Sequence, residues 1–292
     1  MTLRLGTRGS ALALAQARIV AELLDAEVEV VPIRTSGDAR VAGDKSRFVK
    51  EIEDALLREE VDLAVHSAKD VPSRLPEGLA IVGVPERADP RDALCGGFET
   101  LDSLPEGAVV GTGSLRRRAQ LLARRPDLRV EGLRGNVDTR LRRLREGDYQ
   151  ALVLAAAGLE RLGLSGGAPL AASDFTPAGG QGCLALEARA DDGPMRALCA
   201  TLTHRQSLQA LMAERALIAA LDASCRTPLA AHAEHRDGEL VLSSFAGLPD
   251  GSTWIRDAVS GVAEDPSALG RAAAERLVAA GADELLREAD RA

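Results

Sequence analysis

The chain has 292 residues, 46% of them hydrophobic and 27% charged, and carries a formal net charge of -8 at pH 7. This length exceeds one ordinary compact core and predicts two or three domains of a soluble globular protein. No apolar run is long enough to span a membrane, and aromatic residues, at 2%, are too few for the stacking platforms of single-stranded nucleic-acid binders.

Segments typical of strands and helices alternate through the first two thirds of the chain. The N-terminal helix has Ser10 as its expected N-cap. The predicted order is strand 3–5, helix 11–24, strand 28–33, helix 48–57, strand 62–66, strand 109–110, helix from 115, strand 151–154 and helix 158–162. This alternation predicts an α/β fold with largely parallel strands, in which ligands bind at the carboxyl ends of the strands.

The last third of the chain has a different pattern. Residues 85–91 and 169–182 are typical of connectors, because proline and glycine interrupt the periodicity there. A long helix over 206–221 is then followed by two strands and by alanine-rich helices. Strands at 239–245 and 254–259 followed by helices indicate a small α+β domain.

Arginines are concentrated between Gly111 and Arg145 in this otherwise acidic chain. Arg116 and Arg117 begin a predicted helix, where their charge opposes the helix dipole, so an anion is expected near them. For the other helical arginines we predict a solvated face: Arg118, Arg124, Arg125, Arg142, Arg143 and Arg145. A local basic field in an acidic protein favours a small polyanionic ligand over a nucleic acid.

Four polar loops fall where the predicted sheets place ligand contacts. Each follows a predicted strand or opens a helix. They are Thr7–Ser10, His66–Pro72, Gly111–Arg117 and Leu133–Arg140. Together they predict a binding site assembled from distant parts of the chain.

The start of the chain has neither the apolar core of a secretory signal nor an arginine- and serine-rich transit segment. We therefore expect a cytoplasmic protein. The four cysteines, Cys95, Cys183, Cys199 and Cys225, are widely spaced without a C-x-x-C pair, which favours neither a disulfide frame nor a zinc site. We expect a typical one to be a small buried side chain and predict no metal site.

A series of ordered motifs resembles the porphobilinogen deaminase family from end to end. The matching words are TRGS from Thr7, FVKEIEDALL from Phe48, VDLAVHSAKDVP from Val61, ERADPRDAL from Glu86, VVGTGSLRRRAQL from Val109, RRPDL from Arg124, LRGNVDTRL from Leu133, LAAAGLERLGL from Leu154, PAGGQGCLALE from Pro177 and DASCRTPLAAHAE from Asp222.

The resemblance implies a particular fold. It has two lobes like those of periplasmic binding proteins, joined by a double crossover, and a small C-terminal α+β domain. Domain 1 comprises residues 1–86 plus 182–201, domain 2 residues 91–176, and domain 3 residues 205–292.

The resemblance also implies a transferase of porphyrin and haem biosynthesis. Family members condense four porphobilinogen molecules head to tail into hydroxymethylbilane and release ammonia at each step. They build on a dipyrromethane primer held through a thioether to one cysteine, which corresponds to Cys225. A metal-free monomer that passes its product to the next tetrapyrrole enzyme is expected, without nucleic-acid or membrane partners.

The family match assigns roles to individual residues. The carboxylates of the primer and of the growing chain would bind Arg116, Arg117, Arg134 and Arg140. The incoming substrate would contact Arg8, Ser10, Gln16 and Arg161, and Lys45 would lie on a loop over the cleft. The primer would be lined by Ser67, Lys69, Thr112 and Ser114.

Asp70 is the catalytic residue that the resemblance implies. Loss of ammonia from porphobilinogen gives a cation, and attack by the next pyrrole gives a second cation that must lose a proton. A fixed carboxylate stabilises both and can handle protons, and Lys69 should help to keep Asp70 ionised. Cys225, as a thiolate, is the family's nucleophile for attaching the primer.

The chain departs from the family pattern in places. Ala223-Ser224 precede Cys225 where the family often has two glycines, which affects the freedom of that loop, and Arg226 replaces a commonly neutral residue. The stretch from Asp38 to Lys45 is shorter than in many relatives, so the loop that carries Lys45 is expected to be trimmed. His232 and His235 are interpreted as ordinary domain residues rather than metal ligands.

Two alternatives come from other classes of protein. A non-catalytic binding protein for a small polycarboxylate would share a two-lobed fold with an arginine-lined cleft. The absence of a signal peptide and the presence of the Cys225 loop count against it. An arginine-rich nucleic-acid binder would show a steep salt dependence of affinity, but the overall acidity and the few aromatics disfavour it.

Overall fold

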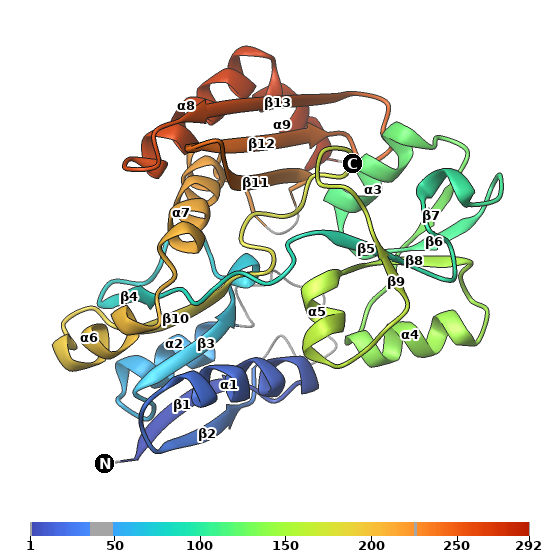
Figure 1. Ribbon diagram of the computed structural model, residues 1–292. Helices are drawn as coiled ribbons and strands as arrows, with labels where there is room; N and C mark the ends of the chain where they lie inside the picture. The colour runs from blue at the N-terminus through green and yellow to red at the C-terminus, as the bar shows by residue number, and fades with distance from the viewer. Residues whose placement is uncertain (1, 36–48, 225–226, 292) are drawn as a thin grey trace. The chain divides into compact units, whose positions relative to one another are not determined.

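The computed structural model describes residues 2–35, 49–224 and 227–291 (Figure 1). They form two compact units: unit 1 is Met1–Ala88 with Gly182–Leu208, and unit 2 is Asp89–Gln181 with Gln209–Ala292. The chain thus leaves unit 1 and returns to it, and both passages fall within or next to the connectors that the sequence predicts.

Unit 1 is built on a five-stranded sheet in the order β2-β1-β3-β10-β4. Strand β1 runs parallel to β2 and β3, whereas β10 is antiparallel to both β3 and β4. The strands are β1 (Leu3–Arg8), β2 (Val28–Ile33), β3 (Leu63–Ser67), β4 (Leu79–Gly83) and β10 (Leu184–Arg189). The helices are α1 (Ala11–Leu23), α2 (Lys50–Leu57) and α6 (Gly193–Thr201), and a short 3-10 helix, η3 (Ala68–Asp70), follows β3.

The two faces of this sheet are covered by different helices, because successive strand residues point to opposite sides. Leu63 and Val65 of β3 pack in one core with residues of α1 and α6. Ala64, between them, packs in the other core with residues of α2. His66, two residues after Ala64, therefore points to the same face as α2. The residues that precede it in β3 are all apolar.

Unit 2 contains a second five-stranded sheet in the order β7-β6-β8-β5-β9. Its strands are β5 (Asp92–Cys95), β6 (Val109–Gly111), β7 (Arg129–Glu131), β8 (Ala151–Ala155) and β9 (Gly167–Pro169). A 3-10 helix, η4 (Leu101–Ser103), follows β5, and α3 (Leu115–Arg124), α4 (Val137–Arg145) and α5 (Ala156–Arg161) cover the sheet. Leu121 of α3 packs on one face, and Leu141 of α4 and Leu159 of α5 pack on the other.

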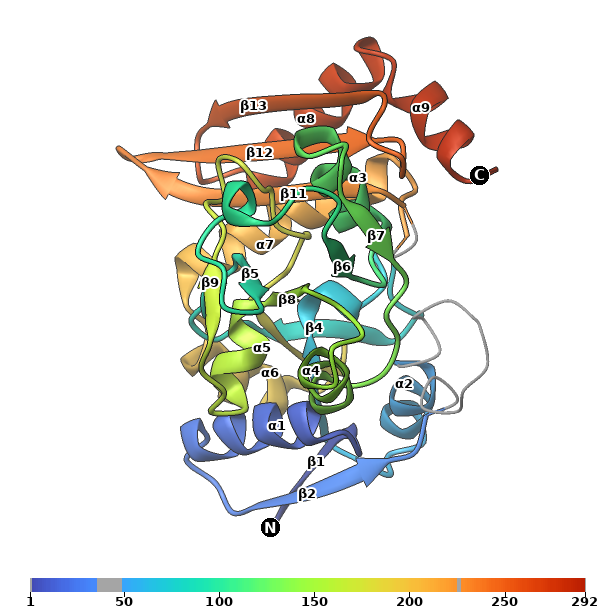
Figure 2. The same ribbon diagram turned by 90° about the vertical axis from the view of Figure 1, so that its right-hand side faces the viewer.

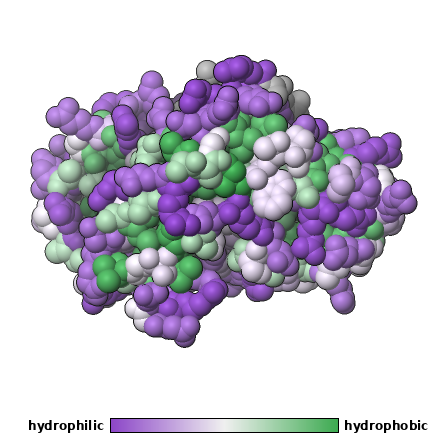
Figure 3. All heavy atoms as spheres, turned by 90° about the horizontal axis from the view of Figure 1, so that it is seen from above, coloured by the Kyte–Doolittle hydropathy of each residue, from purple (hydrophilic) through white to green (hydrophobic). Residues whose placement is uncertain are grey.

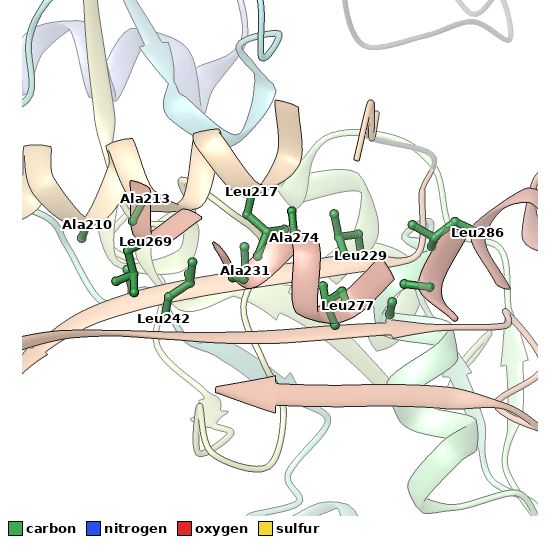
Figure 4. Close-up of a cluster of buried hydrophobic side chains, with 14 of the residues drawn as sticks. Ala210, Ala213, Leu217, Leu229, Ala231, Leu242, Leu269, Ala274, Leu277 and Leu286 are labelled. Carbon is green, nitrogen blue, oxygen red and sulfur yellow. The ribbon is translucent and has the colours of Figure 1, made fainter. Parts of the chain in front are cut away.

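The remainder of unit 2 is a three-stranded antiparallel sheet, β11-β12-β13, covered by helices (Figure 2). Helix α7 (Arg205–Ala220) leads into β11 (Leu229–Arg236), β12 (Glu239–Gly247) and β13 (Trp254–Gly261), and α8 (Pro266–Ala279) and α9 (Ala282–Ala289) follow. Leucine and alanine side chains from α7, α8, α9 and the sheet form its core (Figure 4). Such a core suits a chain with few aromatic residues.

Most predicted elements of the α/β fold are found, with differences at specific strands. Strands 28–33, 239–245 and 254–259 are present, the last two extended by two residues at their C-terminal ends, whereas the helix expected at 158–162 begins at Ala156. The sheets are mixed rather than largely parallel, because β5 and β10 run against their neighbours. The third sheet also has a strand, β11, that was not predicted.

The surface and the cysteines agree with the composition. Figure 3 shows hydrophilic side chains over most of the visible face, with smaller hydrophobic areas between them. Cys95, Cys183 and Cys199 are free and buried, as predicted for cysteines without a chemical role. Within the described residues, no helix is both long and apolar enough to cross a membrane.

Candidate functional site

A pocket in unit 1 lies at the carboxyl ends of β1 and β3, two parallel neighbours whose ends share one edge of the sheet. Five of the residues that the sequence assigns to the site line it. They are Arg8, Ser10, Gln16, Ser67 and Asp70. The pocket is completed by residues without an assigned role: Thr7, Leu12, Ala13, Val49, Val65 and His66.

Hydrogen bonds fix the polar wall of this pocket. Gln16 donates from Nε2 to Ser67 Oγ at 2.8 Å, and the Ser67 hydroxyl lies 3.1 Å from Gln16 Oε1. Ser10 is the N-cap of α1, as predicted, and its hydroxyl accepts from the Ala13 amide at 3.3 Å. Helix α1 and strand β3 are therefore joined by side chains that also face the pocket.

Asp70 reaches the pocket because the chain turns directly after β3. The turn is η3, whose start is held by a hydrogen bond from the Ala68 amide to the Cys183 carbonyl at 3.0 Å. Val71 closes the turn by donating to the Ala68 carbonyl at 3.2 Å. Lys69 is half-buried in the same turn but does not line the pocket.

A second group of assigned residues lies in unit 2, at the loops that open α3 and α4. Ser114 is the N-cap of α3 and accepts from the Arg117 amide, and its own amide donates to Thr112 Oγ1 at 3.3 Å. Arg140 donates from Nε to the Gly135 carbonyl at 2.7 Å. Arg134 is exposed.

Arg116 and Arg117 are buried, and both bind Asp92 of β5. Arg116 Nη1 lies 2.7 Å from Asp92 Oδ2, and Arg117 places Nε and Nη2 at 2.8 and 2.7 Å from Oδ1. Burial alone would raise the pKa of the Asp92 carboxyl, but the two guanidiniums hold this pKa well below its usual range. The anion expected at the start of this helix is thus present within the chain itself.

Further contacts complete this buried group. Gln181 donates from Nε2 to Asp92 Oδ1 at 3.1 Å and to the Pro90 carbonyl at 2.7 Å. Arg117 Nη1 donates to the Val153 carbonyl at 2.8 Å, so three of its nitrogens have partners within unit 2. Two positive charges against one negative leave the group with a net charge of +1.

The other helical arginines are only partly the solvated face that the sequence predicts. Arg124, Arg142 and Arg143 form exposed ion pairs with Asp102, Glu146 and Asp148. Arg118 instead donates to the Pro249 and Val130 carbonyls at 3.2 Å. Arg125 binds Asp127 and the Leu101 carbonyl, both at 2.7 Å. Arg118 and Arg125 therefore stabilise the fold of unit 2, because they donate hydrogen bonds to backbone carbonyls of other segments.

Two assigned residues, Cys225 and Lys45, lie outside the described residues, and their roles stay predictions. The described neighbours of Cys225 are the end of α7 and the start of β11, the elements on either side of its loop. Arg161 is half-buried at the end of α5 in unit 2. In the described ranges, no group of histidine, cysteine or acidic residues is arranged to hold a metal ion.

Several buried polar residues near these sites have no role assigned to them individually from the sequence. Asp92, Gln181, His66 and Glu187 are at most 5% exposed. Their only local signal is a polar residue in an apolar strand or, for Gln181, between two glycines. Their partners are far away in the sequence, so no local pattern identifies them.

Two family models match the chain. Residues 3–197 match "Porphobilinogen deaminase, dipyromethane cofactor binding domain", and residues 208–279 match "Porphobilinogen deaminase, C-terminal domain". Together these matches cover most of the chain, including the pocket of unit 1 and both arginine loops of unit 2.

Among solved structures, the chain is similar to YhfZ from Shigella flexneri, with 19% identity over 75% of this chain and 95% of that chain, at a TM-score of 0.37. The periplasmic VFT2 domain of BvgS from Bordetella pertussis is 14% identical over 68% and 84%, at 0.38. A putative methionine-binding lipoprotein from Bacillus subtilis is 12% identical over 70% and 92%, at 0.40. Likenesses at this level define no ligand.

Proposed function

This chain belongs to the porphobilinogen deaminase (hydroxymethylbilane synthase) family of tetrapyrrole synthesis, and from this membership we propose that it joins four porphobilinogen molecules head to tail with release of ammonia. The product is hydroxymethylbilane, and the chain grows on a dipyrromethane primer bound through a thioether to Cys225.

The observation that carries this proposal is the pocket of unit 1. It brings Asp70 together with Arg8, Ser10 and Gln16, which come from a different part of the chain. A guanidinium suits the acetate or propionate of porphobilinogen, and hydroxyl and amide groups suit its remaining polar atoms. One pocket therefore offers a cation for the substrate's carboxylates and an anion for its reacting end.

Asp70 acts on the charge that forms when ammonia leaves. Departure of the amine makes the pyrrole cationic, and a carboxylate held at the pocket wall stabilises that charge without having to reorganise. The turn that carries Asp70 directly follows β3 and is held by backbone hydrogen bonds to Cys183 and within the turn itself, so the carboxylate stands on a fixed support.

The residues of unit 2 fit a dipyrromethane, whose acetate and propionate groups are anionic. Arg134 is exposed, and Thr112 and Ser114 offer hydroxyls at a helix start. When bound, the dipyrromethane supplies the pyrrole carbon from which the chain grows. Arg134 and Arg140 would hold its carboxylates. Arg116 and Arg117 would add the net positive charge that Asp92 leaves uncompensated.

The test measures mass and activity on the same preparations. Wild type should carry the extra mass of two linked pyrroles, located by peptide mapping to Cys225, and should release ammonia from porphobilinogen. A Cys225→Ser variant should lack the mass and the activity, whereas Cys199→Ala, which removes a buried thiol, should keep both. If wild type binds porphobilinogen but neither gains mass nor releases ammonia, a non-catalytic polycarboxylate-binding protein becomes the better description.

A further inference from the structure

Three titratable side chains form a buried cluster next to the pocket of unit 1. His66 of β3 places Nε2 at 2.9 Å from Oε2 of Glu187 on β10, and Glu53 of α2 lies on the same side of the sheet. Their exposed fractions are 5%, 0% and 6%. His66 also lines the pocket, so the cluster extends from the protein interior to the site of Asp70.

The polar atoms of this cluster are poorly satisfied. Glu53 Oε1, His66 Nε2 and both carboxylate oxygens of Glu187 are buried without a well-aligned hydrogen bond to any residue that the structure describes. Buried polar groups are nearly always hydrogen-bonded, so such a group of exceptions requires an explanation. Acidic and imidazole groups can satisfy one another only through protons that they carry themselves.

We propose that His66, supported by the buried carboxylate of Glu187, is a second proton-transfer group of the pocket, beside Asp70. A carboxylate behind an imidazole orients the ring and stabilises its protonated form, as in other acid–base pairs. This role rests on the proposed condensation of porphobilinogen.

The chemistry of that condensation needs such a group. The bond between the aminomethyl carbon and nitrogen breaks, and its electron pair leaves with the nitrogen as ammonia if the amine enters protonated. A new carbon–carbon bond then uses a π pair of the acceptor pyrrole, and the hydrogen on the attacked ring carbon must leave as a proton. His66 accepts this proton and returns it to water. Asp70 can then remain ionised and stabilise the cation.

The charged groups around the imidazole come from every element packed near it. Glu53 and Asp54 lie on α2, and burial followed by the nearby Glu187 raises the pKa of Glu53 to about 7. Glu187 and Arg189 lie on β10, Arg8 ends β1, and Asp70 belongs to η3. The Glu53 carboxyl, with a pKa of about 7, can thus exchange a proton near neutral pH. Such exchange suits a cluster that must accept and release one proton in every catalytic cycle.

The test compares His66→Asn with His232→Asn. His232 is a matched control because it is also buried on a strand and faces a buried carboxylate, Glu214, at 3.7 Å, but it lies in unit 2. Wild type must first consume porphobilinogen, since without turnover the proposed function itself fails. In the His66 variant kcat should fall by about 10²–10³ with little change in KM, and His232→Asn should keep its rate.

Porphobilinogen deuterated at its free α carbon separates proton transfer from structural support. His66→Asn should show a larger deuterium isotope effect on kcat than wild type, and added imidazole should restore part of the rate of His66→Ala. A rate within about threefold of wild type would overturn the proposal. So would a lost rate with an unchanged isotope effect and no rescue by imidazole.

A measurement on the wild-type protein decides the case in which the His66 variants do not fold. The chain has four histidines, so variants of the other three assign the His66 ring signals in NMR spectra. Because His66 lines the pocket, binding of porphobilinogen should shift these ring signals. Ring signals that do not move at saturating porphobilinogen would overturn the proposal.

Discussion

Replacing Glu53 with glutamine should stabilise unit 1 at alkaline pH and have little effect in acid. Burial, followed by the charge of Glu187, raises the pKa of Glu53 from 4.5 to about 7. The folded protein therefore binds more protons than the unfolded chain between these two values. It follows that the free energy of unfolding falls as the pH rises through this range.

The expected size of the effect comes from that interval. At about 1.4 kcal/mol per pH unit, an ionised Glu53 costs the folded state about 3 kcal/mol at pH 8. Glutamine has nearly the same shape and does not ionise, so Glu53→Gln avoids this cost. Since about 1 kcal/mol shifts the melting temperature of a domain of this size by at least roughly 2–4 °C, a gain of about 6–12 °C is expected at pH 8.

Calorimetric melting of wild type and Glu53→Gln at about pH 5 and about pH 8 tests this reasoning. The difference between the two proteins should be small at the lower pH and large at the higher one. Glu22→Gln is the matched control, because Glu22 is an exposed helical glutamate of the same unit. Equal stabilities of wild type and Glu53→Gln at pH 8 would refute the conclusion that burial raises the pKa of Glu53.

Three further outcomes are expected. Asp92→Asn should lower the free energy of unfolding by about 3–5 kcal/mol in urea melts, because two buried guanidiniums lose their charge partner; an unchanged midpoint would contradict that balance. Asp70→Asn should reduce kcat by on the order of 10²–10³-fold at an unchanged melting temperature, and full turnover would remove Asp70 from the mechanism. Arg134→Ala should impair primer assembly or elongation, seen by intact mass, whereas Arg142→Ala, which breaks only an exposed pair with Glu146, should not.

The pocket could be predicted from the sequence because its loops follow local patterns. A strand that ends in polar residues, followed by a helix with a serine cap, locates Arg8 and Ser10 on one sheet edge. Parallel pairing of β1 and β3 then brings Ser67 and Asp70 to the same edge. Periodicity and capping need only neighbouring residues, so these features are visible in a single sequence.

The partners of the buried charges could not be predicted in this way. The sequence suggested an external anion at Arg116 and Arg117, but the anion is Asp92, from a strand whose direction against its neighbours was not foreseen. His66 and Glu187 likewise meet only because β10 is inserted next to β3. Pairing between distant strands depends on the topology of the whole unit, and local propensity carries no information about it.

The position of β10 has a consequence for the order in which the protein can be built. Strands β3 and β4 do not pair with each other, and β10 lies between them in the sheet. During synthesis, strands β1 to β4 therefore leave the ribosome long before β10, the strand that joins β3 to β4. Until β10 arrives, the edges of β3 and β4 remain open and the carboxylate of Glu187 is missing. Unit 1 must wait for residues 89–181 to be synthesised, and a fragment that ends at Ala88 should expose unpaired strand edges and aggregate.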